Sequence, residues 1–297
     1  MDKEWQQANL HAIAERLAPL RYLPDGVVYD ARAGLHHIRI LKQHSQLLLY
    51  FVTATGALDG PMSRIDLDHP LRLLAPYTQA LLLALLWRPA PERICVLGFG
   101  GGRMSLVLHH GLPHAIIDNV EIDPAFATIA PHFFGIAFDA RQQLHIADAR
   151  AFLASTTRQY DMLLMDAFTD DSDALDHLAT AQFYALCAQR LARGGVLGVN
   201  LLRSDPRLAE KLRALRSQFP STCVLELKHS LVVFGLAAQR RDTGLARRAA
   251  ELAARYGFDF PFAAHAAALR PARAMSDALL QQLRRAAPLD DARLVED

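Results

Sequence analysis

A glycine-rich stretch between two apolar segments constrains the fold of this chain more than any other feature. Residues 94–97 form a short apolar run suited to a buried parallel strand, four glycines follow within 98–102, and an apolar-rich stretch at 104–110 can begin a helix. Glycine lets the backbone turn tightly and lie against a ligand where a Cβ would collide. The next apolar run, 116–122, carries Glu121 near its end, about 20 residues past the last glycine, where a carboxylate can bind both ribose hydroxyls. The pattern predicts a nucleotide-dependent enzyme.

The composition is that of a globular protein. The chain has 297 residues, of which 52% are hydrophobic and 21% charged, so it can bury one large core or two modest ones, and disordered or fibrous classes are excluded. Its 32 lysine and arginine residues balance 31 aspartate and glutamate residues, so no global basic field attracts nucleic acid or an anionic membrane. We therefore expect neither among its partners.

The cysteines and the N-terminal residues indicate a cytoplasmic protein. Cys95, Cys187 and Cys223 are odd in number, far apart and without metal-ligand spacing, which favours buried thiols in a reducing compartment. The N-terminal residues lack an apolar signal core, and the longest apolar stretch, at 80–87, is shorter than a bilayer span.

No metal site is expected. The histidine pairs at 36–37 and 109–110 are adjacent in sequence, so their side chains point in opposite directions on a strand and diverge by about 100° on a helix. Neither pair is a natural chelate.

Three regions follow one another along the chain. Residues 1–90 combine an N-terminal helical pattern with β-like segments, which predicts a small β-rich lobe. Residues 91–237 alternate apolar strands with helical segments and end in a hairpin, which predicts a mostly parallel sheet covered by helices, with a terminal antiparallel hairpin. Residues 238–297 are rich in Ala, Arg and Leu with helical periodicity, which predicts a helical C-terminal extension, either a cap or a dimerisation element.

The elements expected within these regions are as follows. Strands are predicted at 27–29, 35–41, 47–52, 94–98, 116–122, 144–146, 162–166, 196–201, 222–227 and 230–236. Helices are predicted at 5–20, 70–87, 103–110, 124–132, 149–155, 180–192, 245–256 and 275–286.

Acidic residues stand at the carboxyl ends of three successive predicted strands. Ligands of open α/β sheets bind outside these strand ends. Glu121 would hold ribose, Asp148 would accept a hydrogen bond from an adenine amino group, and Asp166 would lie nearest the reacting end. The alternative for Asp148 is an ordinary helix N-cap before 149–155.

Several motifs between residues 94 and 236 resemble those of the spermidine synthase (polyamine aminopropyltransferase) family. The segment from Asp166 to Asp170, followed by His177 and Leu178, is more similar to the spermidine-synthase-like branch than to the true synthases. The matching segments are the glycine loop 98–102, Val-Glu-Ile-Asp at 120–123, Ile-Ala-Asp-Ala at 146–149, 160–168, Phe-Tyr at 183–184 and 191–197.

The resemblance implies a Rossmann-like, methyltransferase-type sheet behind a small N-terminal β lobe. It implies S-adenosylmethionine or its decarboxylated form as co-substrate and no metal, and relatives are commonly dimers or tetramers, so we expect a homodimer. In the family, the aspartates after the fourth strand orient the acceptor amine and take its proton, and the matching candidates are Asp166 and Asp170. The expected donor-binding residues are Gly98, Gly100, Gly101, Gly102, Arg103, Glu121, Asp148 and Ala149.

The departures from the family pattern concern the donor tail. True synthases carry an aspartate in the glycine loop that binds the ammonium of the aminopropyl group, and the matching residue here is Arg103. An arginine would repel that ammonium but could pair with the carboxylate of intact S-adenosylmethionine. The alternative is that Arg103 turns outward from the first helical turn. Family Tyr-Gln and Tyr-His-Glu motifs are reduced to Leu-His at 35–36 and Tyr-Thr-Gln at 77–79.

The acceptor is expected to be a small cationic amine or another basic group. Asp170, Asp171, Asp173 and Asp176 fall within seven residues and would attract positive charge, although solvated loops are often acidic as well. Tyr77 is retained and could line the acceptor pocket, or pack at the junction between lobes. We expect Tyr77, Asp170, Asp171 and Asp173 to bind the acceptor.

Three functions remain open on the sequence. The first is aminopropyl transfer to a polyamine, supported by the resemblance and the acidic loop. The second is methyl transfer from S-adenosylmethionine to a basic acceptor, supported by Arg103 and the lost donor-tail residues. The third is a catalytically silent nucleotide-binding or assembly module, against which Glu121, Asp148 and Asp166 argue together.

Overall fold

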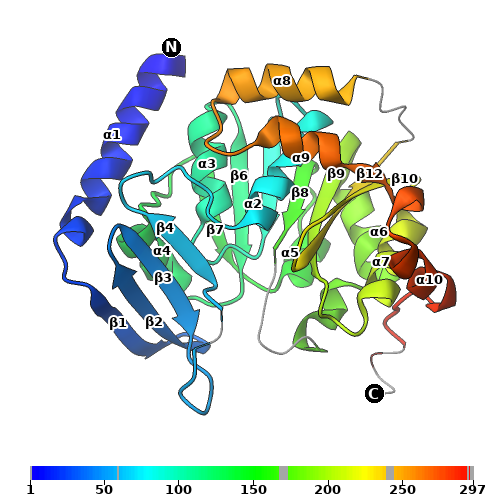
Figure 1. Cartoon of the computed structure of the whole chain (residues 1–297), viewed down its shortest axis with the longest axis horizontal. Coiled ribbons are helices and arrows are strands. Elements are labelled where there is room, and N and C mark those ends of the chain that lie inside the picture. The colour runs from blue at the N-terminus through cyan, green and yellow to red at the C-terminus, as the bar shows by residue number, and fades with distance from the viewer. Residues whose placement is uncertain (1, 59, 167–172, 239–243, 293, 295–297) are drawn as a thin grey trace.

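Two β-sheets of different size organise the chain (Figure 1). The structure is a computed structural model that describes residues 2–58, 60–166, 173–238, 244–292 and 294. The smaller sheet belongs to the N-terminal region, and the larger one runs through the rest of the molecule. This arrangement confirms the expected α/β class.

The N-terminal lobe packs a helix and a small antiparallel sheet against the larger body. Ile13 and Leu17 of the first helix are fully buried with Ile38 and Leu47 of the sheet and with Phe134 of the neighbouring domain. In Figure 1 this helix and sheet lie on the left. The elements are α1 (Asp2–Arg21), β1 (Gly26–Ala33), β2 (His36–Gln43), β3 (Gln46–Phe51) and β4 (Ser63–Asp66), with strand order β1-β2-β3-β4.

The helix predicted at 70–87 is shorter in the structure. Helix α2 spans Pro76–Leu81 and continues as the 3₁₀ helix η1 (Leu82–Leu86). A residue that precedes proline is pushed away from helical angles, and Ala75 before Pro76 is extended at φ −91° and ψ 123°. Proline itself is tolerated in the first turn, where its missing N–H costs no hydrogen bond. The helix therefore begins at Pro76, and the preceding residues form a loop.

The larger sheet has eight strands, five of them joined in parallel. Its order is β12-β10-β11-β9-β8-β5-β6-β7, and the hairpin β10–β11 pairs antiparallel with β9. Because β5 has β6 on one side and β8 on the other, the chain changes direction across the sheet at β5, which is where such folds bind ligands. The strands are β5 (Arg93–Leu97), β6 (Ile116–Glu121), β7 (Gln142–Ile146), β8 (Tyr160–Met165), β9 (Leu191–Leu202), β10 (Ser221–Glu226), β11 (Ser230–Leu236) and β12 (Arg270–Pro271).

Helices cover both faces of this sheet, so its central strands carry apolar side chains toward both faces. In β5, Ile94 and Val96 enter one core, whereas Cys95 and Leu97 enter the core on the opposite face. The helices that connect the strands are α3 (Arg103–Gly111), α4 (Phe126–Phe134), α5 (Ala149–Ser155), the 3₁₀ helix η2 (Asp173–Leu178), α6 (Ala181–Arg190) and α7 (Leu208–Gln218). Neither β4 nor α7 was predicted from the sequence.

The C-terminal residues are integrated into the same body. Leu252 and Phe262 enter the core on one face, and Leu279 and Leu283 enter the core on the other. Figure 1 shows α8 and α9 above the sheet and α10 at its far end. The elements are α8 (Leu245–Tyr256), α9 (Phe262–Ala268), η3 (Ala272–Ala274) and α10 (Asp277–Arg285), with β12 between α9 and η3. Within the described part of the chain, no helix has the length and apolar character needed to cross a bilayer.

Candidate active site

The glycine loop is held by the carboxylate of Glu121. The backbone N–H groups of Phe99 and Gly100 donate to Glu121 Oε2 at 3.1 and 2.9 Å, and that of Asp123 donates to Oε1 at 3.0 Å. Gly98 and Gly100 have φ of +85° and +51°, a region that glycine enters without steric cost. Glu121 therefore fixes the loop that follows β5 while it stands at the end of β6.

The two other glycines of the loop allow close packing. A Cβ on Gly101 would lie 2.8 Å from the Ser63 side chain of β4, and a Cβ on Gly102 would lie 2.6 Å from the Phe99 ring. The Gly101 N–H also donates to Ser63 Oγ at 3.0 Å. Gly101 thus lets the loop pack against the N-terminal lobe, and Gly102 lets the loop turn closely onto the Phe99 ring. Neither glycine lines the cavity at the carboxyl ends of the parallel strands.

A cavity of about 690 Å³ opens at the carboxyl ends of the parallel strands. Its volume falls within the usual range for ligand sites. Leu35 and Ile122 are exposed apolar side chains in its wall and offer a surface for a planar base. The predicted site residues that line this cavity are Tyr77, Gly98, Gly100, Arg103, Glu121, Asp148, Ala149 and Asp166.

Asp148 caps a helix and also borders the cavity. Its Oδ1 accepts from the Ala151 N–H at 2.8 Å, which makes it the N-cap of α5. Its Oδ2 lies 2.9 Å from His177 Nε2, and His177 itself lines the cavity. Burial alone would raise the pKa of Asp148, but the hydrogen bonds from His177 and from backbone N–H groups outweigh it and lower the pKa. Both interpretations of Asp148 are therefore compatible with the structure.

Asp166 lies in the cavity wall within a polar cluster. Its backbone N–H donates to Leu97 O at 2.8 Å, which places it beside the start of the glycine loop. The Asn200 Nδ2 donates to Asp166 Oδ1 at 3.1 Å, and the Tyr77 hydroxyl also donates to this carboxylate. Burial raises the pKa of Asp166 to about 7, against the opposing effect of these hydrogen bonds. The charge of Asp166, with burial, raises the pKa of Tyr77 well above its usual value.

Arg103 turns inward, so the alternative of an outward orientation is wrong. It is 7% exposed, and its Nη2 donates to the carbonyls of Pro70 and, at 3.3 Å, Arg72. Its Nε and Nη1 are buried without a hydrogen-bond partner among the described residues. Burial lowers the pKa of this guanidinium to about 9. A buried cation with two unused donors in a cavity wall is suited to an anionic ligand group.

The acidic loop fits the sequence prediction only in part. Asp170 and Asp171 lie outside the described residues, as does the side chain of Asp173, whose backbone begins η2. Asp176 is buried in ion pairs with Lys211 and, at 2.7 Å, Arg207. Its expected contribution to acceptor attraction is therefore wrong, because its charge stabilises the contact between η2 and α7.

Several polar residues of the cavity escaped the sequence-based choice of site residues. Asn200 on β9, Ser63 and Arg64 on β4, and His177 on η2 all line the cavity. His177 stood within a recognised motif, but no role was assigned to it. Asn200 lies in an apolar strand, and this single amide among apolar residues is the signal that could have identified it. The two β4 residues had no local signal, because β4 itself was not predicted.

The N-terminal lobe closes one side of the cavity through Asp123. The Leu35 N–H donates to Asp123 Oδ2 at 3.1 Å, and His36 Nδ1 lies 2.7 Å from the same oxygen. The His36 ring stacks on Phe51 with ring centres 3.9 Å apart. Leu35 and His36 therefore connect the β1–β2 turn to the end of β6.

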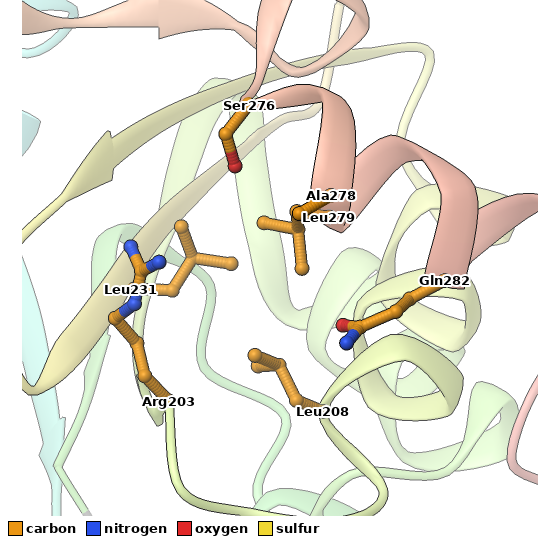
Figure 2. Close-up of a pocket in the computed structure, with 7 residues that line it drawn as sticks. All are labelled: Arg203, Leu208, Leu231, Ser276, Ala278, Leu279 and Gln282. Carbon is orange, nitrogen blue, oxygen red and sulfur yellow. The ribbon is translucent and has the colours of Figure 1, made fainter.

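A second hollow, of about 130 Å³, lies between β11 and α10 (Figure 2). Its one charged lining residue, Arg203, pairs with Glu226 at 3.1 Å, and the other Glu226 oxygen accepts from the Ser276 N–H at 2.9 Å. The hollow is a packing gap under the C-terminal helix. Across the described ranges, no cluster of three or more His, Cys, Asp or Glu side chains could hold a metal ion.

Known proteins with similar sequences are transferases. A polyamine aminopropyltransferase of Vibrio vulnificus is 32% identical over 206 residues, which cover 68% of this chain and 68% of that protein. The chain belongs to the polyamine aminopropyltransferase family. A mouse eEF1A lysine and N-terminal methyltransferase is 31% identical over 153 residues, 46% of this chain and 22% of that protein. No family model matches the chain.

Solved structures agree with the polyamine aminopropyltransferase fold. A probable spermidine synthase from Corynebacterium glutamicum superposes with a TM-score of 0.67 at 17% identity and covers 91% of this chain and 97% of that one. The similarity extends through the N-terminal sheet and the large sheet, which confirms the Rossmann-like architecture expected from the sequence.

Proposed function

We propose that this family member transfers a methyl group from intact S-adenosylmethionine to the nitrogen of an amine. The observation that carries the proposal is Arg103. Its guanidinium has no acidic partner among the described residues and lines the cavity that Glu121 and Asp166 also line. A decarboxylated donor would bring its ammonium toward this cation, whereas intact S-adenosylmethionine would bring a carboxylate that the guanidinium can pair with.

The nucleoside end of the donor fits the other side of the cavity. We assign ribose to Glu121 and the adenine amino group to Asp148, with Ala149 and the exposed Ile122 beside the base. Gly98 and Gly100 bring the loop backbone into the wall of the same cavity. Each carboxylate oxygen can accept more than one hydrogen bond, so the contacts of Glu121 to the loop leave capacity for ribose.

Asp166 is the proposed general base. S-adenosylmethionine supplies an electrophilic methyl carbon on a positively charged sulfur. The amine nitrogen forms a bond to this carbon, the carbon–sulfur bond breaks with its electron pair passing to sulfur, and Asp166 accepts the proton lost from nitrogen. Tyr77 and Asn200 orient the carboxylate through their hydrogen bonds to it. Asp170 is proposed to assist at the acceptor side.

Calorimetry with both donors tests the proposal. We expect wild type to bind S-adenosylmethionine at least about tenfold more tightly than its decarboxylated form, and Arg103→Asp to reverse the preference. The matched control is Arg284→Asp on the exposed side of α10, which should leave both affinities unchanged. Binding of neither donor would contradict the proposal and favour the silent module.

The released nucleoside identifies the group transferred. Methyl transfer yields S-adenosylhomocysteine. Methylthioadenosine formed from the intact donor would keep the role of Arg103 but contradict methyl transfer.

Aminopropyl transfer to a polyamine is the second candidate. Family membership and the cluster of Asp166, Tyr77 and Asn200 support it. It predicts preference for the decarboxylated donor and release of methylthioadenosine.

A further inference from the structure

A second arginine, Arg64, stands in the wall of the cavity that Tyr77 also lines. Arg64, on β4, is half-buried and lines the cavity together with Met62 and Leu74. Its positive charge counteracts the rise in the pKa of the Tyr77 hydroxyl, which places the guanidinium in the electrostatic neighbourhood of that hydroxyl. Tyr77 in turn donates to Asp166. Arg64 therefore lies on the acceptor side of the proposed reaction.

Arg64 has unused hydrogen-bonding capacity. A guanidinium carries five N–H donors, and the contact that Arg64 makes through its side chain is a long one, from Nη2 to Leu74 O at 3.4 Å. It forms no ion pair with an acid within the described ranges. The two carboxylates at the nucleoside end of the wall differ in this respect, since Glu121 accepts three backbone N–H groups and Asp148 pairs with His177.

Among the residues that the structure describes, the charges around Arg64 do not suit a second ammonium group. Of the acids described near the acceptor side, Asp166 faces the cavity, whereas Asp176 is neutralised by Lys211 and Arg207. A diamine bound by one nitrogen at Asp166 would bring its other ammonium toward the apolar wall and Arg64, where like charges repel. An amine with a carboxylate at its far end would instead form a charge-assisted, two-pronged contact with the guanidinium.

We propose that the acceptor is an amino acid, with its reacting amine at Asp166 and its carboxylate bound by Arg64. The inference rests on the proposed function in one respect, the placement of the amine at Asp166, and it holds for either transferred group. It assigns to Arg64 the selection of amino acids against diamines.

Binding of matched ligands tests the proposal. The pair 4-aminobutanoate and 1,4-diaminobutane has the same amine and differs at the far end in the sign of the charge. Calorimetric titrations are made with protein alone and with protein saturated with S-adenosylhomocysteine. Wild type should bind 4-aminobutanoate at least about tenfold more tightly. A preference for the diamine in wild type would overturn the proposal, whether or not any variant folds.

Variants of Arg64 test its role. Arg64→Gln should weaken 4-aminobutanoate by at least about tenfold without weakening 1,4-diaminobutane, and Arg64→Glu should invert the preference. Arg32→Gln, at an exposed arginine on β1 of the same lobe, is the matched control and should change neither affinity. Equal losses for both ligands in Arg64→Gln would overturn the proposal.

A separate titration identifies which carboxylate Arg64 binds. If Arg64→Gln weakens S-adenosylmethionine but not its decarboxylated form, the carboxylate belongs to the donor and the proposal is overturned. If both donors bind the variant as they bind wild type, the acceptor assignment is supported. If wild type does not bind S-adenosylhomocysteine, the proposed function is contradicted. A preference for 4-aminobutanoate over 1,4-diaminobutane, measured with protein alone, would still support the role of Arg64.

Discussion

Asp166 combines burial with neutral neighbours. Asn200 and Tyr77 hydrogen-bond to its carboxylate but carry no charge at neutral pH, so burial dominates and raises its pKa to about 7. A general base works best when its pKa is close to the operating pH, because it is then both available and basic enough to take a proton. The site thus tunes this carboxylate by excluding water and placing amide and phenol groups beside it.

The rate should depend on the protonation of Asp166. Only the deprotonated carboxylate accepts a proton, so kcat/KM should fall about tenfold per pH unit below about pH 7 and level off above it. Asp166→Asn should lower turnover by about 10²–10⁴-fold and leave donor binding intact. Asp68→Asn, at an exposed aspartate, is the control and should keep the wild-type profile. Unchanged turnover in Asp166→Asn would remove this residue from the catalytic role.

The Asp166 carboxylate should also lower the free energy of unfolding at high pH. Its pKa is raised from 3.8 to about 7 in the folded protein, so between these values the folded state binds more protons than the unfolded state, and stability falls as pH rises. Asp166→Asn cannot ionise and should be more stable than wild type at pH 8, by on the order of 3 kcal/mol. The difference should vanish near pH 4. Urea unfolding at the two pH values measures it, and equal stability at pH 8 would contradict the assigned pKa.

At the scale of elements, the β1–β2 turn is positioned by a glycine. Gly34 has φ of +61°, and a Cβ there would lie 1.7 Å from Asp123 Oδ1. Gly34→Ala should therefore displace Asp123 and break its contacts to Leu35 and His36. We expect a loss of about 1–3 kcal/mol in unfolding free energy and weaker donor binding.

A glycine elsewhere in the same lobe provides the control for this turn. Gly56 also has positive φ, +82°, but a Cβ there meets no atom within 4 Å. Gly56→Ala should lower stability only through the strain of placing alanine at positive φ, and it should leave donor affinity unchanged. If both variants bound donor equally well, the turn would have no part in forming the cavity.

The elements that the sequence predicted well share one physical property. Apolar runs in the large sheet are buried on both faces, so strands such as β5 and β8 stand out from their surroundings. Because ligands bind at the carboxyl ends of such strands, the positions of Glu121 and Asp166 at the cavity followed from the same pattern. Site residues whose role depends on the meeting of distant elements were missed, because the pattern of one segment does not show which other element it will contact. Arg64 comes from a short edge strand, and Asn200 reaches Asp166 from the neighbouring strand of the sheet.

At the scale of the whole molecule, the C-terminal extension crosses from one face of the large sheet to the other. Helices α8 and α9 pack on one core, strand β12 pairs with β10 at the edge, and α10 packs on the second core. The residues beyond 238 thus share both hydrophobic cores with the central domain. A separate cap would instead contact one surface, and its unfolding would leave the hydrophobic cores of the central domain buried.

Substitutions on the two faces should therefore destabilise a single cooperative unit. Leu252→Ala in α8 and Leu283→Ala in α10 each empty a buried position, 3% and 4% exposed, and should each lower the free energy of unfolding by about 2–5 kcal/mol. Arg284→Ala, exposed beside Leu283, should change it by less than about 0.5 kcal/mol. In urea, both leucine variants should shift the midpoint of one transition, seen equally by fluorescence and circular dichroism. A separate early transition in either variant would show that the C-terminal helices unfold independently, and would contradict a body whose cores the extension completes.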